Sequence, residues 1–136
     1  MAREREYART VPAGHRKSYG QYFTPVPVAR FMCSWACADA RTMLDPAVGN
    51  SIFFRCVIEQ NPSCSLTGYE IDQKILDYFG NPASAHILSE DYLLGDWNRK
   101  YDAIVCNPPY GRFQAVARRE EVLGQFCLHT GRSFSR

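Results

Sequence analysis

Short apolar runs alternate with helical segments between residues 41 and 106, and this alternation constrains the fold more than any other feature. The runs expected to form strands are residues 41–45, 65–71, 85–88 and 101–106. Apolar residues recur at helical spacing over 52–58 and 72–80, and Asn50 is expected to cap the first of these helices. Strands that alternate with helices predict an α/β fold, a mainly parallel sheet with flanking helices.

A further helix is predicted before the first strand. Thr24 is expected to cap it, and Pro25 and Pro27 suit its first turn. Its apolar stripe, expected to pack on the sheet, consists of Val28, Phe31, Met32 and Trp35. The preceding residues 18–25 are predicted to form an ordered loop, and residues 1–17 a basic N-terminal arm.

Charge is unevenly distributed along the 136 residues. The formal net charge is +4 over residues 1–30, −5 over 31–110 and +3 over 111–136. This pattern is compatible with a polyanion held by the basic flanks, and equally with scattered surface charge. No apolar run approaches the roughly 20 residues of a membrane helix, and the N-terminus lacks the apolar core of a secretory signal. We therefore expect a cytoplasmic protein with no membrane partner.

The six cysteines match no metal-binding pattern. Cys33 and Cys37 are one helical turn apart, but no second pair has a matching spacing, and the three histidines lie far from them in sequence. We expect no metal site and mostly buried, reduced thiols.

Polar residues follow the predicted strands, where open parallel sheets bind their ligands. After the first strand, Gly49 permits a tight turn and the next helix points free N–H groups at the turn. The phosphate-loop lysine is missing and Asp45 would repel a phosphate, so a ligand with both a cation and a carboxylate fits better. An ordinary glycine turn is the alternative. Glu70, 25 residues after Asp45, is placed to bind ribose hydroxyls, and Asp91 to accept from an adenine amino group.

The fourth strand ends in Asn107-Pro108-Pro109-Tyr110, whose chemistry suits an aromatic amino group. The lone pair of such a nitrogen is delocalised into the ring, so the nitrogen is a poor nucleophile. The Asn107 side-chain oxygen and the Pro108 carbonyl can accept its two hydrogens, which favours a pyramidal nitrogen. The prolines fix the backbone, and Tyr110 can stack on a flipped base. A proline-rich turn is the alternative.

Read in order, these segments resemble the successive motifs of N6-adenine-specific DNA methyltransferases. They are Gly20-Gln-Tyr-Phe-Thr-Pro25, Asp45-Pro-Ala-Val-Gly49, Glu70-Ile-Asp72, Asp91-Tyr92 and Asn107-Pro-Pro-Tyr110. The resemblance implies a Rossmann-like methyltransferase fold, S-adenosyl-L-methionine as the methyl donor, and N6 of a flipped adenine in DNA as the acceptor. The carrier would be a bacterial, archaeal or phage modification system.

The resemblance also assigns residues to roles. The cofactor-binding residues would be Phe23, Thr24, Pro25, Asp45, Ala47, Gly49, Glu70, Ile71, Asp91, Tyr92 and Asn107, and the catalytic residues Asn107, Pro108, Pro109 and Tyr110. Thr24 and the turn at 47–49 would hold the methionine end, Glu70 the ribose, and Ile71, Asp91 and Tyr92 the adenine.

The chain departs from the family in two respects. Ser51 stands near the position of a second glycine, and only 26 residues, with one predicted helix over Ala115–His129, follow Tyr110. The family sheet has about seven strands in the order 3-2-1-4-5-7-6. We therefore expect residues 18–136 to be the N-terminal part of a catalytic domain, with an incomplete sheet and 101–106 at its edge. A C-terminal half or a specificity subunit would be a partner.

Two alternatives remain open. The acceptor could be a protein glutamine amide or an RNA base, because these nitrogens pose the same lone-pair problem. The chain could also be an inactive remnant or split subunit that binds the cofactor or a partner.

Overall fold

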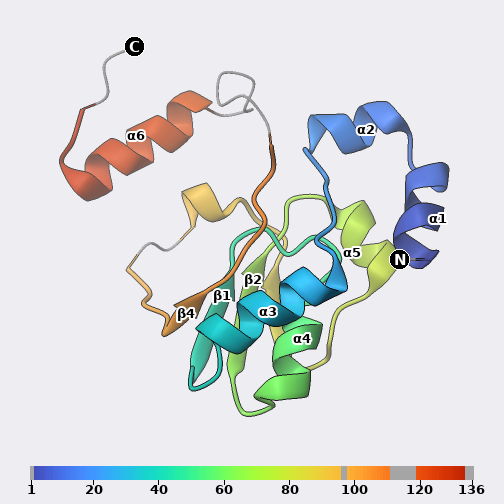
Figure 1. Ribbon diagram of the computed structural model, residues 1–136. Helices are drawn as coiled ribbons and strands as arrows, with labels where there is room; N and C mark the ends of the chain where they lie inside the picture. The colour runs from blue at the N-terminus through green and yellow to red at the C-terminus, as the bar shows by residue number, and fades with distance from the viewer. Residues whose placement is uncertain (1, 96–97, 111–118, 134–136) are drawn as a thin grey trace.

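Strands and helices alternate along the chain as the sequence predicts (Figure 1). The computed structural model describes residues 2–95, 98–110 and 119–133. Its elements are α1 (Ala2–Thr10), α2 (Ala13–Ser18), α3 (Val26–Ala36), β1 (Thr42–Asp45), α4 (Ile52–Gln60), β2 (Ser65–Tyr69), α5 (Gln73–Phe79), β3 (Ala85–Leu88), the 3₁₀ helix η1 (Tyr92–Leu94), β4 (Ala103–Ile104) and α6 (Arg119–Thr130).

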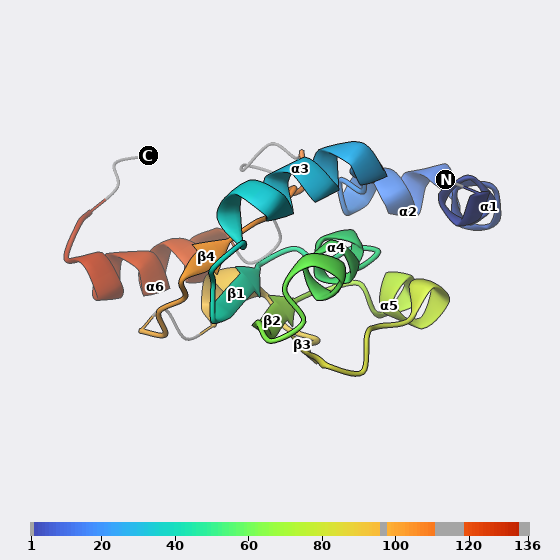
Figure 2. The same ribbon diagram turned by 60° about the horizontal axis from the view of Figure 1, so that its bottom comes forward.

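The four strands form one parallel sheet in the order β3-β2-β1-β4 (Figure 2). Asp45 at the end of β1 lies opposite Gly68 of β2, and Tyr69 of β2 lies opposite Leu88 of β3. In the part of the chain that is described, β4 pairs only with β1, and it is shorter than the predicted run 101–106. Parallel pairing brings the carboxyl ends of all four strands to one edge of the sheet. The predicted α/β fold is confirmed.

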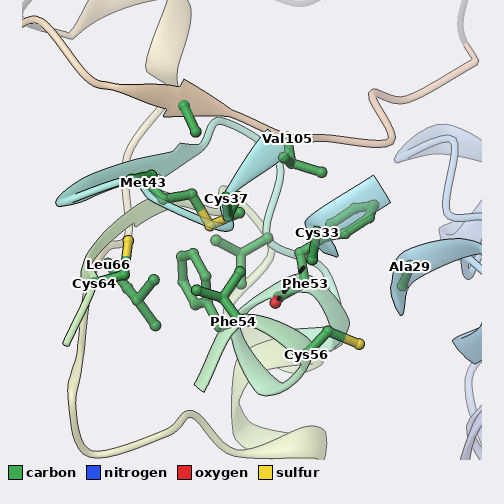
Figure 3. Packing of buried hydrophobic residues seen from close by; sticks show 14 of the residues in the cluster. Ala29, Cys33, Cys37, Met43, Phe53, Phe54, Cys56, Cys64, Leu66 and Val105 are labelled. Atoms are coloured by element: carbon green, nitrogen blue, oxygen red, sulfur yellow. Dashed lines mark hydrogen bonds between the residues drawn. The ribbon is translucent and has the colours of Figure 1, made fainter. Parts of the chain in front are cut away.

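The core lies between the sheet and the helices α3 and α4, which pack on each other (Figure 3). Phe53 and Phe54 of α4 are almost fully buried, as are Met43 of β1 and Leu66 of β2. Gly68 of β2 leaves space for this packing, since a Cβ there would lie 2.3 Å from Val48 Cγ2 and 2.7 Å from Phe54 Cζ. The glycine therefore brings the turn after β1 and the helix α4 directly onto β2.

The prediction for the buried face of α3 is wrong. The bulky residues Val28, Phe31 and Trp35 are 47%, 70% and 83% exposed, whereas Ala29 and Cys33 are fully buried. Met32, also assigned to the stripe, is only partly buried. The small residues face the core because they allow close approach to α4, and the Cys33 thiol lies 3.6 Å from the Phe53 carbonyl oxygen that accepts its hydrogen bond. Both faces of α3 are apolar, so hydrophobic periodicity favoured the larger side chains.

Two predicted helix caps are also displaced by one residue. The cap of α3 is Pro25 rather than Thr24, and the cap of α4 is Ser51 rather than Asn50. Ser51 has a φ of 60°, the left-handed conformation that favours glycine. The predicted helix over 72–80 is α5, with Asp72 as its cap and Gly80 at its end.

Residues 2–17, within the segment predicted as a basic arm, form α1 and most of α2 and fold against α5. Tyr7 is fully buried, and its ring lies 5.1 Å from that of Tyr78 and 5.3 Å from that of Phe79. Arg3 Nη2 donates to the Tyr78 carbonyl at 2.6 Å. The division of the chain at residue 17 stays a prediction.

The helix α6 lies at the opposite end of the molecule from α1 (Figures 1 and 2). It contacts η1. The helix predicted over Ala115–His129 is observed from Arg119, and residues 115–118 lie outside the described residues. Among the described residues no helix is long and apolar enough to cross a membrane. No group of three or more histidine, cysteine or acidic side chains in the same ranges could hold a metal ion.

Candidate functional site

A pocket of about 360 Å³ lies at the carboxyl edge of the sheet, between the loops after all four strands and the segment that precedes α3. This volume is in the range of small-molecule sites. Its wall contains most of the predicted site residues: Phe23, Thr24, Ala47, Gly49, Glu70, Ile71, Asp91, Tyr92, Asn107, Pro108 and Pro109. Three other predicted residues, Pro25, Asp45 and Tyr110, are not on this wall.

Asp45 is the last residue of β1, and its side chain holds the turn that follows this strand. The side chain is fully buried, and Oδ1 accepts a hydrogen bond from the Ala47 N–H at 3.0 Å, while Oδ2 is buried without a partner in the described part of the chain. Burial raises the pKa of the Asp45 carboxyl to about 7, and the charge of Glu70 adds to the rise. A cation close to Oδ2 would stabilise the ionised form.

Glu70 follows β2, and its carboxylate lines the pocket. Oε2 accepts from the Gly49 N–H at 2.8 Å, and Oε1 accepts from the Asp72 N–H at 2.9 Å. Burial raises the pKa of Glu70, although the two N–H groups oppose the rise. A carboxylate has about four acceptor positions, so each oxygen retains a lone pair for a ligand.

The third loop places Asp91 and Tyr92 on the same wall. Asp91 Oδ1 accepts from the Leu93 N–H at 3.0 Å and so caps η1. The ring of Tyr92 lies 5.2 Å from that of Tyr69 in an edge-to-face arrangement. Ile71, 54% exposed, presents an apolar surface to the pocket. This part of the pocket can hold a flat ring with an amino group.

Asn107 follows β4, and the loop before α3 fixes the orientation of its side-chain amide. Nδ2 donates to the Tyr22 carbonyl at 3.0 Å, so Oδ1 is the atom left to accept a ligand hydrogen. Gly20 makes this loop approach possible: its φ is +58°, and a Cβ there would lie 2.9 Å from Pro109 Cβ and 3.0 Å from the Tyr110 nitrogen. The edge-to-face pair of Tyr22 and Tyr110, with ring centroids 5.6 Å apart, lies at the surface.

A second, more open hollow of about 670 Å³ adjoins the first pocket. The two share a wall made of Tyr22, Phe23, Thr24, Asn107 and Pro108. Pro25 and Tyr110 line this second hollow. Apart from the buried Asp45, the predicted site residues therefore line two neighbouring chambers, and Asn107 borders both.

Sequence reasoning missed several residues of the site. Tyr22 contributes its backbone carbonyl, and no side-chain pattern signals such a role. Gln21, Val48, Ile52, Phe53 and Tyr69 also line the first pocket. Ile52 and Phe53 could have been found, because the first turn of a helix that follows a ligand-binding loop faces the ligand.

This architecture agrees with the family to which the sequence is matched. The family model of the N-6 DNA methylases matches residues 6–122. The chain belongs to the N-6 DNA methylase family. The resemblance inferred from the motifs is thereby confirmed.

Curated relatives of this chain are longer proteins. The chain is 37% identical over 116 residues to the Type II methyltransferase M.AccI of Acinetobacter calcoaceticus, with 81% of this chain and 22% of the relative covered. It is 33% identical over 102 residues to M.TthHB8I of Thermus thermophilus, with 74% and 23% covered. The chain thus spans less than a quarter of the length of either relative.

Solved structures similar to this chain support the fold. The plantazolicin methyltransferase BpumL, solved with S-adenosylhomocysteine, has a TM-score of 0.51 at 16% identity, with 92% of this chain and 46% of BpumL covered. A type I restriction-modification methyltransferase subunit from Streptococcus thermophilus also has a TM-score of 0.51, at 20% identity, with 78% and 31% covered.

Proposed function

We propose that this chain binds S-adenosyl-L-methionine in the first pocket and carries the transfer of its methyl group to N6 of adenine in DNA. The observation that carries the proposal is the wall shared by the two chambers. Asn107 and Pro108 border both, so a donor in the first pocket and an acceptor in the second hollow would meet at these residues. Transfer by direct displacement requires such an alignment of two bound molecules.

The first pocket fits the proposed cofactor. Glu70 would accept from the ribose hydroxyls with its remaining lone pairs, and Asp91 and Ile71 would hold the adenine. The turn over 47–49 would hold the methionine end. The buried Oδ2 of Asp45, which has no partner among the described residues, is an acceptor for which a ligand ammonium would be the complementary charge. S-adenosyl-L-methionine supplies a methyl group on a positively charged sulfur when it is bound.

Asn107 and Pro108 would prepare the acceptor nitrogen. Because Nδ2 donates to the Tyr22 carbonyl, Oδ1 of Asn107 is the atom that would accept one N6 hydrogen, while the Pro108 carbonyl would accept the other. Their pull would keep the nitrogen pyramidal, so that its lone pair could form the bond to the methyl carbon. The electron pair of the broken sulfur–methyl bond would stay on sulfur, and one N6 proton would pass to water. Tyr110, 72% exposed at the second hollow, would stack on the base.

The proposed partner is DNA, with the target adenine rotated out of the helix. The family, named for DNA N-6 methylation, and the Type II methyltransferases among its relatives favour this substrate. Because the relatives are several times longer, we propose that a further segment or a separate specificity subunit selects the DNA sequence. This N-6 DNA methylase chain would then supply the cofactor site and the transfer step.

Calorimetric titration with S-adenosyl-L-homocysteine tests the cofactor. We expect binding by the chain and a loss of about 1–3 kcal/mol in Glu70→Ala, because the ribose hydroxyls lose a charged acceptor. Glu59→Ala, which removes an exposed carboxylate that pairs with Arg30, is the matched control. Equal affinity in Glu70→Ala and the control would remove Glu70 from the site.

Transfer of a labelled methyl group tests the acceptor, with single-stranded DNA, RNA and a glutamine-containing peptide offered in parallel. We expect label on adenine N6 of DNA alone, and a large loss in Asn107→Ala while the affinity for the homocysteine product changes little. Asn98→Ala, at an exposed position, is the control. Label on the peptide or RNA and none on DNA would overturn the substrate. If none of the three substrates is labelled, the proposed methyl transfer by this chain is contradicted, while the proposed cofactor site is unaffected.

A further inference from the structure

A chain of hydrogen bonds links the first two helices to the cofactor pocket through Asp72. The Asp72 side chain is only 4% exposed. Its Oδ2 accepts from His15 Nε2 at 2.7 Å and from Gln21 Nε2 at 2.6 Å, and its Oδ1 accepts from the Lys74 N–H at 3.1 Å. A carboxylate only accepts, so the His15 ring carries its hydrogen on Nε2. Asp72 is therefore held by three donors from three segments of the chain.

The backbone of Asp72 in turn holds Glu70. Its N–H donates to Glu70 Oε1 at 2.9 Å, while the Gly49 N–H holds Oε2. Both oxygens proposed to receive the ribose hydroxyls are thus aimed by backbone groups. The position of one of these groups depends on the side chain of Asp72, and so on His15 and Gln21.

The N-terminal end of this chain of bonds is the buried residue Tyr7. Tyr7 is fully buried, and its hydroxyl donates to Gln21 Oε1 at 3.1 Å. That bond fixes the orientation of the Gln21 amide, because Oε1 is occupied and Nε2 must then point to Asp72. The Tyr7 ring is held by Phe23 at 5.7 Å and by Phe79 at 5.3 Å.

The same bonds hold residues 19–24 beside the pocket. Residues 19–24 form one side of the first pocket, and Glu70 and Ile71 lie on its wall as well. Gln21 belongs to this segment, so its bond to Asp72 ties the two sides together. Figure 1 shows the connection from α2 to α3 passing beside the loops that follow the strands.

We propose that His15 and Gln21 are positioning residues, which act through Asp72 to hold Glu70 in the orientation that selects a ligand with a ribose 2′-hydroxyl. This inference rests on the proposed cofactor. Neither residue contacts the reacting atoms in this scheme. Loss of either donor lets Asp72 turn towards water, which shifts its N–H and releases Glu70 Oε1.

The test compares the affinity of the chain for S-adenosyl-L-homocysteine and for the same molecule without its 2′-hydroxyl. We expect the unmodified chain to prefer the hydroxylated ligand by about tenfold or more. His15→Ala and Tyr7→Phe should each reduce this preference by about threefold or more. In a Glu70→Ala background, His15→Ala should change the preference no further. His86→Ala, at an exposed position on β3, should leave it unchanged.

The outcomes separate the proposals. If His15→Ala weakens both ligands equally, or neither, the positioning role is overturned and the contact is only structural. If the unmodified chain binds neither ligand, the proposed cofactor itself fails. Circular dichroism checks whether His15→Ala folds. If it does not, Tyr7→Phe still gives the ratio of the two ligand affinities, because this substitution removes one oxygen and keeps the buried ring.

Discussion

At the scale of single residues, the site combines buried acidic groups with backbone donors. Asp45 is the extreme case, since its carboxyl is fully buried and only one oxygen has a partner in the described ranges. Burial is the first cause of its raised pKa, about 7 against an ordinary value of 3.8. Such a group makes the empty pocket sensitive to pH in a range where ordinary carboxylates stay ionised.

Asp45 should make the ligand-free protein less stable as pH rises. Between pH 4 and 7 the folded state keeps a proton on Asp45 that the unfolded state has lost, so the free energy of unfolding falls with rising pH by up to about 1.4 kcal/mol per unit. Above pH 7 both states are ionised and this slope vanishes. Urea unfolding from pH 4 to 8 should show the slope in the unmodified chain and a weaker one in Asp45→Asn. Parallel curves would show that Asp45 is not the group responsible.

Gly20 lies in the loop before α3, where this loop approaches Pro109 and Tyr110. Gly20→Ala should lower the free energy of unfolding by about 1–3 kcal/mol, because its φ is +58° and a Cβ would crowd Pro109. Gly14→Ala is the control: it lies in α2 with nothing within 4 Å of a new Cβ, and should be neutral or stabilising by up to about 1 kcal/mol. Urea unfolding measures both. Equal effects would contradict the close approach.

At the scale of elements, α3 shows how a helix with two apolar faces chooses one. Its narrow face, with Ala29 and Cys33, packs on α4, and its bulky face is exposed. Burial of Phe31 or Trp35 would bring more apolar area out of water, but these side chains would hold the two helices further apart. Close packing of backbone and small residues decides the orientation.

The two faces of α3 should respond oppositely to substitution. Cys33→Leu should cost about 1–3 kcal/mol, since it adds volume to a fully buried position beside Phe53. Trp35→Gln should stay within about 0.5 kcal/mol, because its side chain is 83% exposed. Chemical denaturation measures the free energy of unfolding of both variants. A larger loss for Trp35→Gln than for Cys33→Leu would reverse the assignment of the buried and exposed faces.

The elements that periodicity and turn chemistry determine were predictable. The runs that became β1, β2 and β3, the helix α5, and the polar residues Gly49, Glu70, Asp91 and Asn107 after the strands follow from local patterns. The exposed face of α3 does not follow from local patterns, because the helix has two apolar faces and packing geometry determines which one is buried. The bonds from His15 and Gln21 to Asp72 do not either, since they join residues more than 50 positions apart without a motif.

At the scale of the whole molecule, apolar side chains remain at the surface around β4 and α3. Ala103 and Val105 point into the core, so Ile104 between them points to the other face of the sheet, where it is 58% exposed. Across the described residues β4 has a neighbour on one side only. A strand edge of this kind offers free N–H and C=O groups to another chain.

We therefore expect the chain to self-associate as its concentration rises. Ile104→Lys should weaken the association, because a charge at the edge opposes the apposition of two apolar strands. Sedimentation velocity over a range of concentrations measures the effect. Val28→Lys places the same charge on the exposed face of α3 and is compared with Ile104→Lys at the strand edge. An unmodified chain that stays monomeric throughout would contradict the prediction.

The shared wall between the two chambers has a consequence for how the proposed activity could change. The residues that border both chambers are Tyr22, Phe23, Thr24, Asn107 and Pro108, so a substitution there would disturb the proposed donor and acceptor together. Five residues border only the second hollow: Pro25, Val28, Met32, Cys106 and Tyr110. Substitutions at these five positions would therefore alter the proposed acceptor site and leave the lining of the proposed donor pocket unchanged.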